Sequence, residues 1–135
     1  MSPASGVQER EQLSAALQFA RVESKVIAHE HAHQAVGGRY AGAASYSYTR
    51  GPDGRAYVTG GEVPIDLSPE RDPSETAAKM RQVRSAALAP ADPSPQDLEV
   101  ASMAAAIEAQ AAAEEIAQSA RDSSTSTGQL VDFRA

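Results

Sequence analysis

Several residue types are scarce or missing in this chain of 135 residues. It has no cysteine and no tryptophan, only 4% of its residues are aromatic, and it contains three histidines. The absence of cysteine excludes disulfide bonds, a thiolate zinc site and a cysteine nucleophile. Any metal ion in this protein must therefore be bound by histidine and carboxylate side chains.

Long apolar runs and clusters of positive charge are also missing. No apolar run approaches the roughly 18 residues of a membrane-spanning helix, and the first residues do not combine a basic start with an apolar stretch. The formal net charge is −6, without a basic patch of the kind that binds phosphate backbones. We therefore expect a cytoplasmic protein that binds neither nucleic acid nor membrane. The sequence carries no signal for an oligomeric state.

The hydrophobic residues, 41% of the chain, are largely alanine. A chain of this length has room for one modest core, which must be built mainly from helix contacts between small side chains. We expect a single domain over residues 1–121. The remaining residues 122–135 begin with a polar Ser/Thr-rich stretch and predict a flexible C-terminal tail.

All three histidines fall in one stretch, His29-Glu30-His31-Ala32-His33, which reads H-E-x-x-H. On a helix, the first and last histidines lie about 40° apart on one face, so both imidazoles can reach one metal ion. Glu30 is rotated about 100° from His29, beside the same site, where it can act on a metal-activated water as a general base. His31 points about 200° away from His29, so we expect it to pack or to face solvent. The motif predicts a zinc site.

The pattern on both sides of this motif predicts an α+β fold. A helix from Ser5 to Val36 carries the motif and stops at Gly37-Gly38. The remaining expected elements are a β-hairpin with strands at 46–50 and 55–59, a short edge strand at 62–66, a helix at 73–88 capped by Asp72, and a helix at 95–121 capped by Ser94. The expected inward stripe of the last helix is Val100, Met103, Ile107 and Ala111.

A catalytic zinc ion usually takes three protein ligands, so two histidines need a partner from elsewhere. No histidine lies outside the cluster, and position 39, where some zinc peptidases have a third histidine, is arginine. The third ligand must then be a carboxylate. Glu62 is our first choice, because Gly60-Gly61 before it would let the strand approach the helix closely. Asp66, on the same side of that strand, is the alternative as ligand or as a residue that supports the site.

The predicted hairpin also carries side chains that could stabilise an oxyanion or contact a substrate. The available groups are Tyr46, Tyr48, Tyr57 and Arg55. Each of them could instead pack across the strands or face solvent. The hairpin edge could hold an extended peptide as an added strand.

Several segments of the chain resemble the bacterial SprA-related metalloprotease family. They are AHEHAH at 28–33, GG at 37–38, YTRGPDGRAY at 48–57, GGEV at 60–63, ID at 65–66 and KMRQVR at 79–84, with similar residues at 86–91 and 93–94. The resemblance covers roughly residues 20 to 100. It implies a minimal zincin-like metalloprotease domain with zinc bound by His29 and His33, and Glu30 as the catalytic residue. It also favours Glu62 as the third ligand, because the GGEV element matches, but it supplies no substrate.

Two hypotheses for the function follow from these observations. The first is a zinc-dependent metallopeptidase that hydrolyses peptide bonds in a peptide or protein substrate. The second is a non-catalytic module that retains zinc for stability and binds a partner protein through the hairpin edge or the alanine-rich helix. The first is favoured because a purely structural zinc site has no need of a glutamate beside its first ligand.

Overall fold

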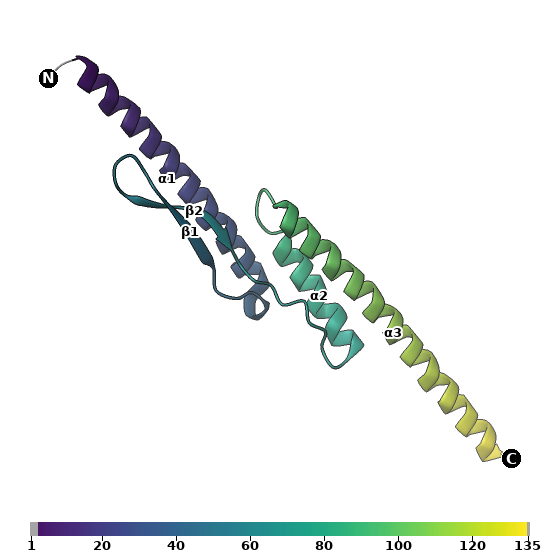
Figure 1. Cartoon of the computed structure of the whole chain (residues 1–135). Coiled ribbons are helices and arrows are strands. Elements are labelled where there is room, and N and C mark those ends of the chain that lie inside the picture. The colour runs from purple at the N-terminus through teal and green to yellow at the C-terminus, as the bar shows by residue number, and fades with distance from the viewer. Residues whose placement is uncertain (1–2, 135) are drawn as a thin grey trace.

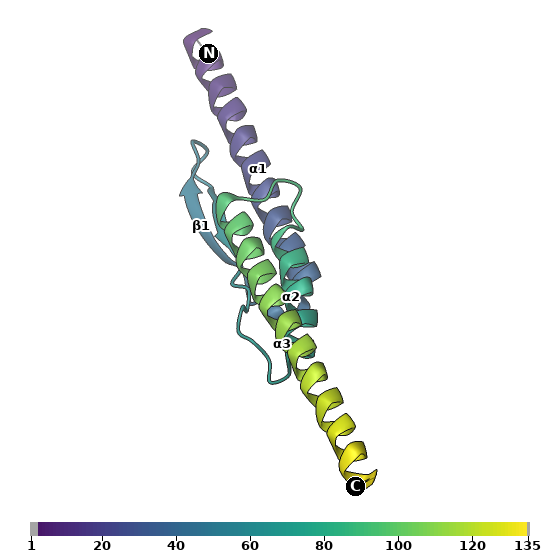
Figure 2. The ribbon, with the colours of Figure 1, turned by 90° about the vertical axis from the view of Figure 1, so that its right-hand side faces the viewer.

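A computed structural model describes the backbone of residues 3–134 and the side chains of residues 6–124. The fold is α+β, as predicted (Figure 1). In chain order its elements are α1 (Pro3–Gly37), the 3-10 turn η1 (Gly38–Tyr40), β1 (Ser45–Arg50), β2 (Ala56–Glu62), α2 (Pro73–Ala87) and α3 (Pro95–Arg134). The hairpin packs on α1. Helices α2 and α3 form an antiparallel pair that lies beside the C-terminal half of α1 (Figure 2).

The long helix α1 begins at Pro3, two residues before the predicted start, and ends at Gly37. Gly38 follows with φ of 54°, a left-handed conformation that costs glycine nothing. The predicted stop at the glycine pair is therefore confirmed. The N-terminal turns of α1 extend beyond the body of the molecule, and the C-terminal turns of α3 extend from the opposite end (Figure 1).

Strands β1 and β2 pair antiparallel, with Ser45 opposite Glu62 and Arg50 opposite Ala56. β2 packs against α1. The pairing continues past β2, because Ala41 and Ile65 form an isolated bridge. The strand predicted at 62–66 is thus the continuation of β2, and residues 56–65 follow one extended path from the hairpin tip into the body of the protein.

The buried core lies between α2 and α3. Met80, Val83 and Ala104 have no exposed surface, and partly buried side chains pack against them: Tyr40, Ile65, Leu67 and Ile107. Burying a side chain such as Val83 or Met80 contributes about 1.5–3 kcal/mol to folding. The set of inward residues predicted for α3 was wrong in one place: Met103 is 46% exposed, and the small Ala101 and Ala104 are buried instead. Ala104 packs in one cluster with Met80 and Val83 of α2. Alanines at the contact let the two helices approach closely.

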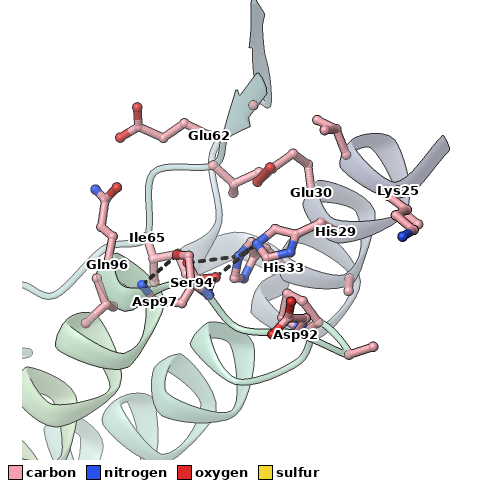
Figure 3. A pocket seen from close by; sticks show the side chains of 18 of the residues that line it. Lys25, His29, Glu30, His33, Glu62, Ile65, Asp92, Ser94, Gln96 and Asp97 are labelled. Carbon is pink, nitrogen blue, oxygen red and sulfur yellow. Dashed lines mark hydrogen bonds and ion pairs between the residues drawn. The ribbon is translucent and has the colours of Figure 1, made fainter. Parts of the chain in front are cut away.

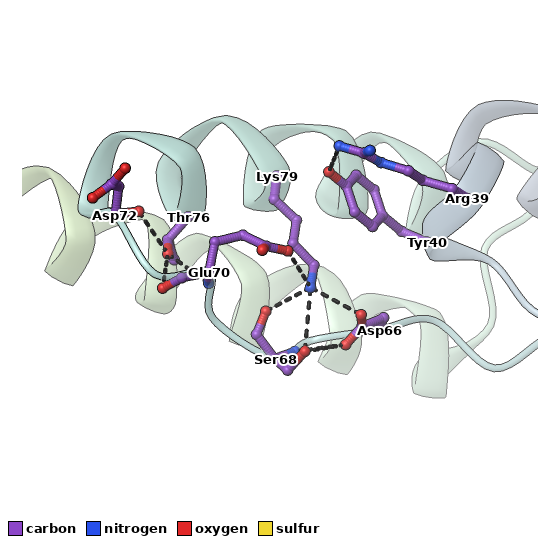
Figure 4. A network of polar contacts seen from close by, with 8 residues as sticks. All are labelled: Arg39, Tyr40, Asp66, Ser68, Glu70, Asp72, Thr76 and Lys79. Carbon is purple, nitrogen blue, oxygen red and sulfur yellow. Dashed lines mark hydrogen bonds and ion pairs between the residues drawn. The ribbon is translucent and has the colours of Figure 1, made fainter.

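The segment after β2 is attached to α2 by the buried Lys79 (Figure 4). Its Nζ donates to Asp66 Oδ2 at 2.9 Å and to the carbonyl oxygen of Ser68 at 2.7 Å, and it lies 3.3 Å from Glu70 Oε1. Thr76, one turn earlier on α2, accepts a hydrogen bond from the backbone N–H of Glu70. These contacts hold residues 66–70 against α2 and so set the position at which the extended 56–65 path enters the core.

Helix α3 is longer than the sequence predicted. We expected it to end near Arg121 and to be followed by a flexible tail, but its backbone continues to Arg134. Helical hydrogen bonds are local, and residues 122–134 contain no proline and a single glycine, so nothing forces an end at 121. The last residue, 135, lies outside the described part of the chain. No helix among the described residues combines the length and the apolar character needed to cross a membrane.

Candidate metal centre

A cavity of about 980 Å³ lies where the C-terminal half of α1, the end of β2 and the start of α3 meet. His29, Glu30 and His33 line it from α1, Gly61 to Ile65 line it from the extended strand, and Asp97 lines it from α3. Figure 3 shows that Asp97 and both imidazoles point toward one another in this cavity. Residues about 65 positions apart in the chain therefore meet at one site.

The two histidines of the motif meet as the helical spacing predicts. Their Nε2 atoms are 3.2 Å apart, and the rings lie edge to face with centroids 4.8 Å apart. His33 is buried, with 2% of its surface exposed, and His29 is half-buried. His31 is exposed on the other side of α1, as expected. Both Nε2 atoms therefore face the same point in the cavity.

The orientation of His33 is set by a backbone group of α2. Its Nδ1 lies 2.8 Å from the carbonyl oxygen of Ala86, which can only accept, so Nδ1 carries the proton. In the neutral imidazole, Nε2 is then left with a lone pair directed at His29 and the cavity. A histidine held by a carbonyl at one nitrogen, with the other nitrogen directed at further possible ligands, is arranged as metal-binding histidines usually are.

Glu30 lies beside the two imidazoles and is almost fully buried, with 3% of its surface exposed. One ligand atom from each of His29, Glu30 and His33 falls within 4.8 Å of the others. Burial raises the pKa of the Glu30 carboxyl above its ordinary value, and the imidazoles only partly offset this effect. This shift comes from burial and nearby charges, and no hydrogen bond from the described residues contributes to it. Glu30 is therefore free to accept a proton from a molecule in the cavity.

The carboxylate that reaches the imidazoles is Asp97, which the sequence reasoning missed. Its Oδ2 is 2.9 Å from His29 Nε2, and its Oδ1 is 3.1 Å from His33 Nε2. Ser94 and Asp97 cap α3 reciprocally: the Ser94 N–H donates to Asp97 Oδ2, and the Asp97 N–H donates to Ser94 Oγ. Burial alone would raise the pKa of Asp97, but the hydrogen bonding with Ser94 and the nearby imidazoles lower it. The only sequence signal for Asp97 was its place three residues after the cap.

The two carboxylates that the sequence favoured as ligands lie elsewhere. Glu62 lines the same cavity, but it is exposed and points away from the imidazoles (Figure 3). Asp66 is outside the cavity, where Ser68 and Lys79 bind its carboxylate and lower its pKa. The close approach expected at the glycine pair is present, because a Cβ on Gly61 would lie 2.9 Å from Glu30 Oε2. That approach brings backbone, and not the Glu62 carboxylate, next to the site.

The hairpin side chains considered as substrate contacts are not part of the cavity lining. Tyr57 is buried against Phe19 and donates its hydroxyl hydrogen to Asp53 Oδ2 at 2.6 Å. Arg55 lies over the Tyr57 ring and 3.8 Å from Glu23 Oε1. Tyr48 is 64% exposed. Tyr57 and Arg55 therefore stabilise the hairpin, and Tyr48 is exposed to solvent.

The donor atoms fit a zinc ion. Bonds of roughly 2.0–2.1 Å in a tetrahedral site separate neighbouring ligand atoms by about 3.3 Å. The two Nε2 atoms are 3.2 Å apart, and the nearest carboxylate oxygens are 2.9 and 3.1 Å from them. Imidazole nitrogen and carboxylate oxygen are common zinc ligands. Without a cation, the lone pair on His33 Nε2 would face a lone pair of Asp97 Oδ1, and the two would repel each other. The arrangement therefore suits a positive ion at its centre.

Comparison with known protein families identifies the chain. The model of the SprA-related family matches residues 4–132. The chain belongs to the SprA-related family. The match includes all of α2 and nearly all of α1 and α3, so it extends well beyond the residues 20 to 100 on which the sequence resemblance was based. No curated protein and no solved structure matches this SprA-related chain.

Proposed function

We propose that this SprA-related protein is a zinc-dependent metallopeptidase, with Glu30 as the general base. The observation that carries the proposal is the position of Glu30 beside two imidazoles in the cavity. It is a buried carboxylate whose pKa is raised, with no hydrogen bond from the described residues contributing to that shift. A general base works best when its pKa is near the working pH, and burial moves Glu30 in that direction. A carboxylate placed in this way is poorly explained by a structural role.

In the proposed reaction, His29 and His33 would hold the metal ion through Nε2. A bound zinc ion polarises the scissile carbonyl and makes water more acidic. Glu30 accepts a proton from the attacking water while the oxygen of that water forms a bond to the carbonyl carbon. Glu30 then gives that proton to the nitrogen of the leaving amine as the C–N bond breaks. The carboxylate ends in its starting state, and one water is consumed for each bond cut.

The extended strand offers a binding surface for a peptide at this site. The backbone groups of Pro64 and Asp66 point to one edge, where they pair with Gly42 and Tyr40. Backbone groups of alternate residues point to opposite edges, so those of Val63 and Ile65 point to the other edge, and both residues line the cavity. Within the described part of the chain these groups have no backbone partner. An extended substrate could pair with them beside Glu30.

Metal removal tests the proposal directly. We expect about one zinc ion per chain and cleavage of members of a random peptide library, with cleavage lost on chelation and restored by added zinc. Mass spectrometry of the products and elemental analysis provide the two measurements. Cleavage that persists in metal-free protein would contradict the proposal. Stoichiometric zinc with no cleavage at all would favour the non-catalytic, zinc-stabilised interaction module.

Gly61 offers a second test, because it alone makes room for Glu30 at the strand. In Gly61→Ala, the new Cβ would lie 2.9 Å from both Cγ and Oε2 of Glu30, so the carboxylate must move. Misplacement of a reacting group by about 1 Å can cost about 10²-fold in rate, so we expect a loss of hydrolysis of that size. Because the new Cβ would also lie 3.1 Å from Val26 Cγ1, the free energy of unfolding should fall by about 1–3 kcal/mol.

The neighbouring glycine is the matched control for this substitution. A Cβ on Gly60 would meet Ser47 at 3.5 Å, an ordinary contact, so Gly60→Ala should leave hydrolysis within a factor of about three. Equal activity of Gly61→Ala and the parent protein would show that the position of Glu30 does not matter for the reaction.

A further inference from the structure

Among the residues whose side chains the structure describes, Asp97 is the carboxylate that contacts both imidazoles of the candidate site. One of its oxygens lies 2.9 Å from His29 Nε2, and the other lies 3.1 Å from His33 Nε2. The side chain is only 15% exposed. Three donor groups, two from α1 and one from the start of α3, thus converge with separations typical of ligands that share one ion.

We propose that Asp97 is the third protein ligand of the zinc ion, and that the metal thereby joins α1 to α3. The inference rests on the zinc site of the proposed function, but it does not depend on peptide hydrolysis. Its chemistry is that of a site with two imidazoles and one carboxylate, which leaves a position open for water or substrate.

The capping arrangement of α3 explains how Asp97 is held ready to bind. Asp97 is the third residue of α3, and its Oδ2 accepts the Ser94 N–H at 2.9 Å. The Asp97 N–H in turn donates to Ser94 Oγ at 3.0 Å. Because one bond fixes the carboxylate and the other fixes the backbone of the same residue, the Asp97 side chain has few alternative rotamers. Metal binding then costs little side-chain conformational entropy. Ser94 is therefore a positioning residue for this ligand.

The other two non-catalytic carboxylates of the cavity lack such an arrangement. Glu62 and Asp92 both line the cavity and both are exposed. Neither has a hydrogen bond or ion pair to an imidazole within residues 6–124. Figure 3 shows Glu62 directed away from the pair of rings. These residues provide matched controls for Asp97, because replacing either carboxylate by its amide removes one negative charge from the same cavity.

A zinc ion bound in this way would connect parts of the fold that otherwise touch little. Within residues 6–124, the polar contacts between α1 and α3 are those of Asp97 with the two histidines. The helical pair is attached to α1 through α2, where His33 contacts Ala86 and Gln82 donates to the carbonyl oxygens of Val36 and Gly37. Zinc should therefore stabilise the parent fold by linking α3 to α1, in addition to completing the site.

The experiment compares zinc affinity in Asp97→Asn, Asp92→Asn and Glu62→Gln, measured on the full chain by competition with a chromophoric chelator. We expect Asp97→Asn to weaken zinc binding by at least about 100-fold, the upper end of what loss of an outer-shell partner costs. The two controls should stay within about threefold of the parent. Ser94→Ala, which removes only the positioning hydroxyl, should weaken zinc binding by about tenfold. At the same zinc concentration, added zinc should raise the unfolding temperature of the parent and of both controls, and should raise that of Asp97→Asn by clearly less.

A second variant keeps the test valid if Asp97→Asn folds poorly. Asp97→Glu retains the charge and the helix-capping acceptor but moves the oxygens by one methylene, so the visible spectrum of bound Co²⁺ should change if residue 97 is a ligand. A Co²⁺ spectrum in Asp97→Glu identical to that of the parent would overturn the proposal, as would loss of affinity in Glu62→Gln with Asp97→Asn unaffected. Zinc binding that depends on Asp97, in a protein that cleaves no peptide, would support this inference and refute the peptidase.

Discussion

Glu30→Gln is expected to lower peptide hydrolysis by about 10³-fold while zinc remains bound, because general acid–base catalysis contributes typically 10²–10⁴-fold. Glutamine has nearly the same size and fills the same buried position, but it cannot accept the proton from water. The parent carboxylate is buried with a raised pKa, so removing its charge should not destabilise the fold. Cleavage rates, zinc content and the unfolding temperature of both proteins check the three parts of this expectation.

Glu62→Gln is the matched control, since it makes the same chemical change at an exposed carboxylate that lines the same cavity. It should retain zinc and keep its hydrolysis rate within a few fold of the parent, so any large loss must come from the position of Glu30 itself. If Glu30→Gln kept full activity, the role of general base would have to be given up. Zinc could then still stabilise the protein without catalysis.

His33→Ala is expected to have the largest effect on metal binding. The free energy of zinc binding to structural sites with four ligands is roughly 10–16 kcal/mol. One ligand therefore accounts for about 3–4 kcal/mol, or about 10³-fold in zinc affinity. His33 is also buried and bonded to the Ala86 carbonyl, so the metal-free variant should unfold with about 1–3 kcal/mol less free energy than the metal-free parent. Chelator competition measures the first effect and denaturant unfolding the second.

His31→Ala provides the comparison, because this histidine lies two residues away on the exposed side of α1. It should leave both zinc affinity and stability nearly unchanged. Similar losses of zinc from His31→Ala and His33→Ala would mean that the H-E-x-x-H spacing does not define the site. A loss of stability in metal-free His33→Ala without any loss of zinc affinity would assign His33 a packing role only.

The features that the sequence determined are those that depend on neighbours along the chain. The helical period alone brings His29 and His33 to one face and leaves His31 on another. The stop at Gly38 follows from the ease with which glycine adopts a left-handed conformation, and the hairpin from its turn residues. Three of the four polar groups of the candidate metal centre come from α1, and they could be named because their relative positions are set within two turns of one helix.

The tertiary structure decided what faces that helix. Glu62 was the reasonable choice along the chain, but the extended strand brings the backbone of Gly61 against Glu30 and turns the Glu62 side chain outward. The carboxylate that meets the imidazoles is Asp97, 64 residues beyond His33, carried by a helix whose position depends on how α2 and α3 pack. Its sequence pattern indicated a helix cap and nothing more. Contacts between distant elements depend on side-chain volumes and packing angles, which no local spacing encodes.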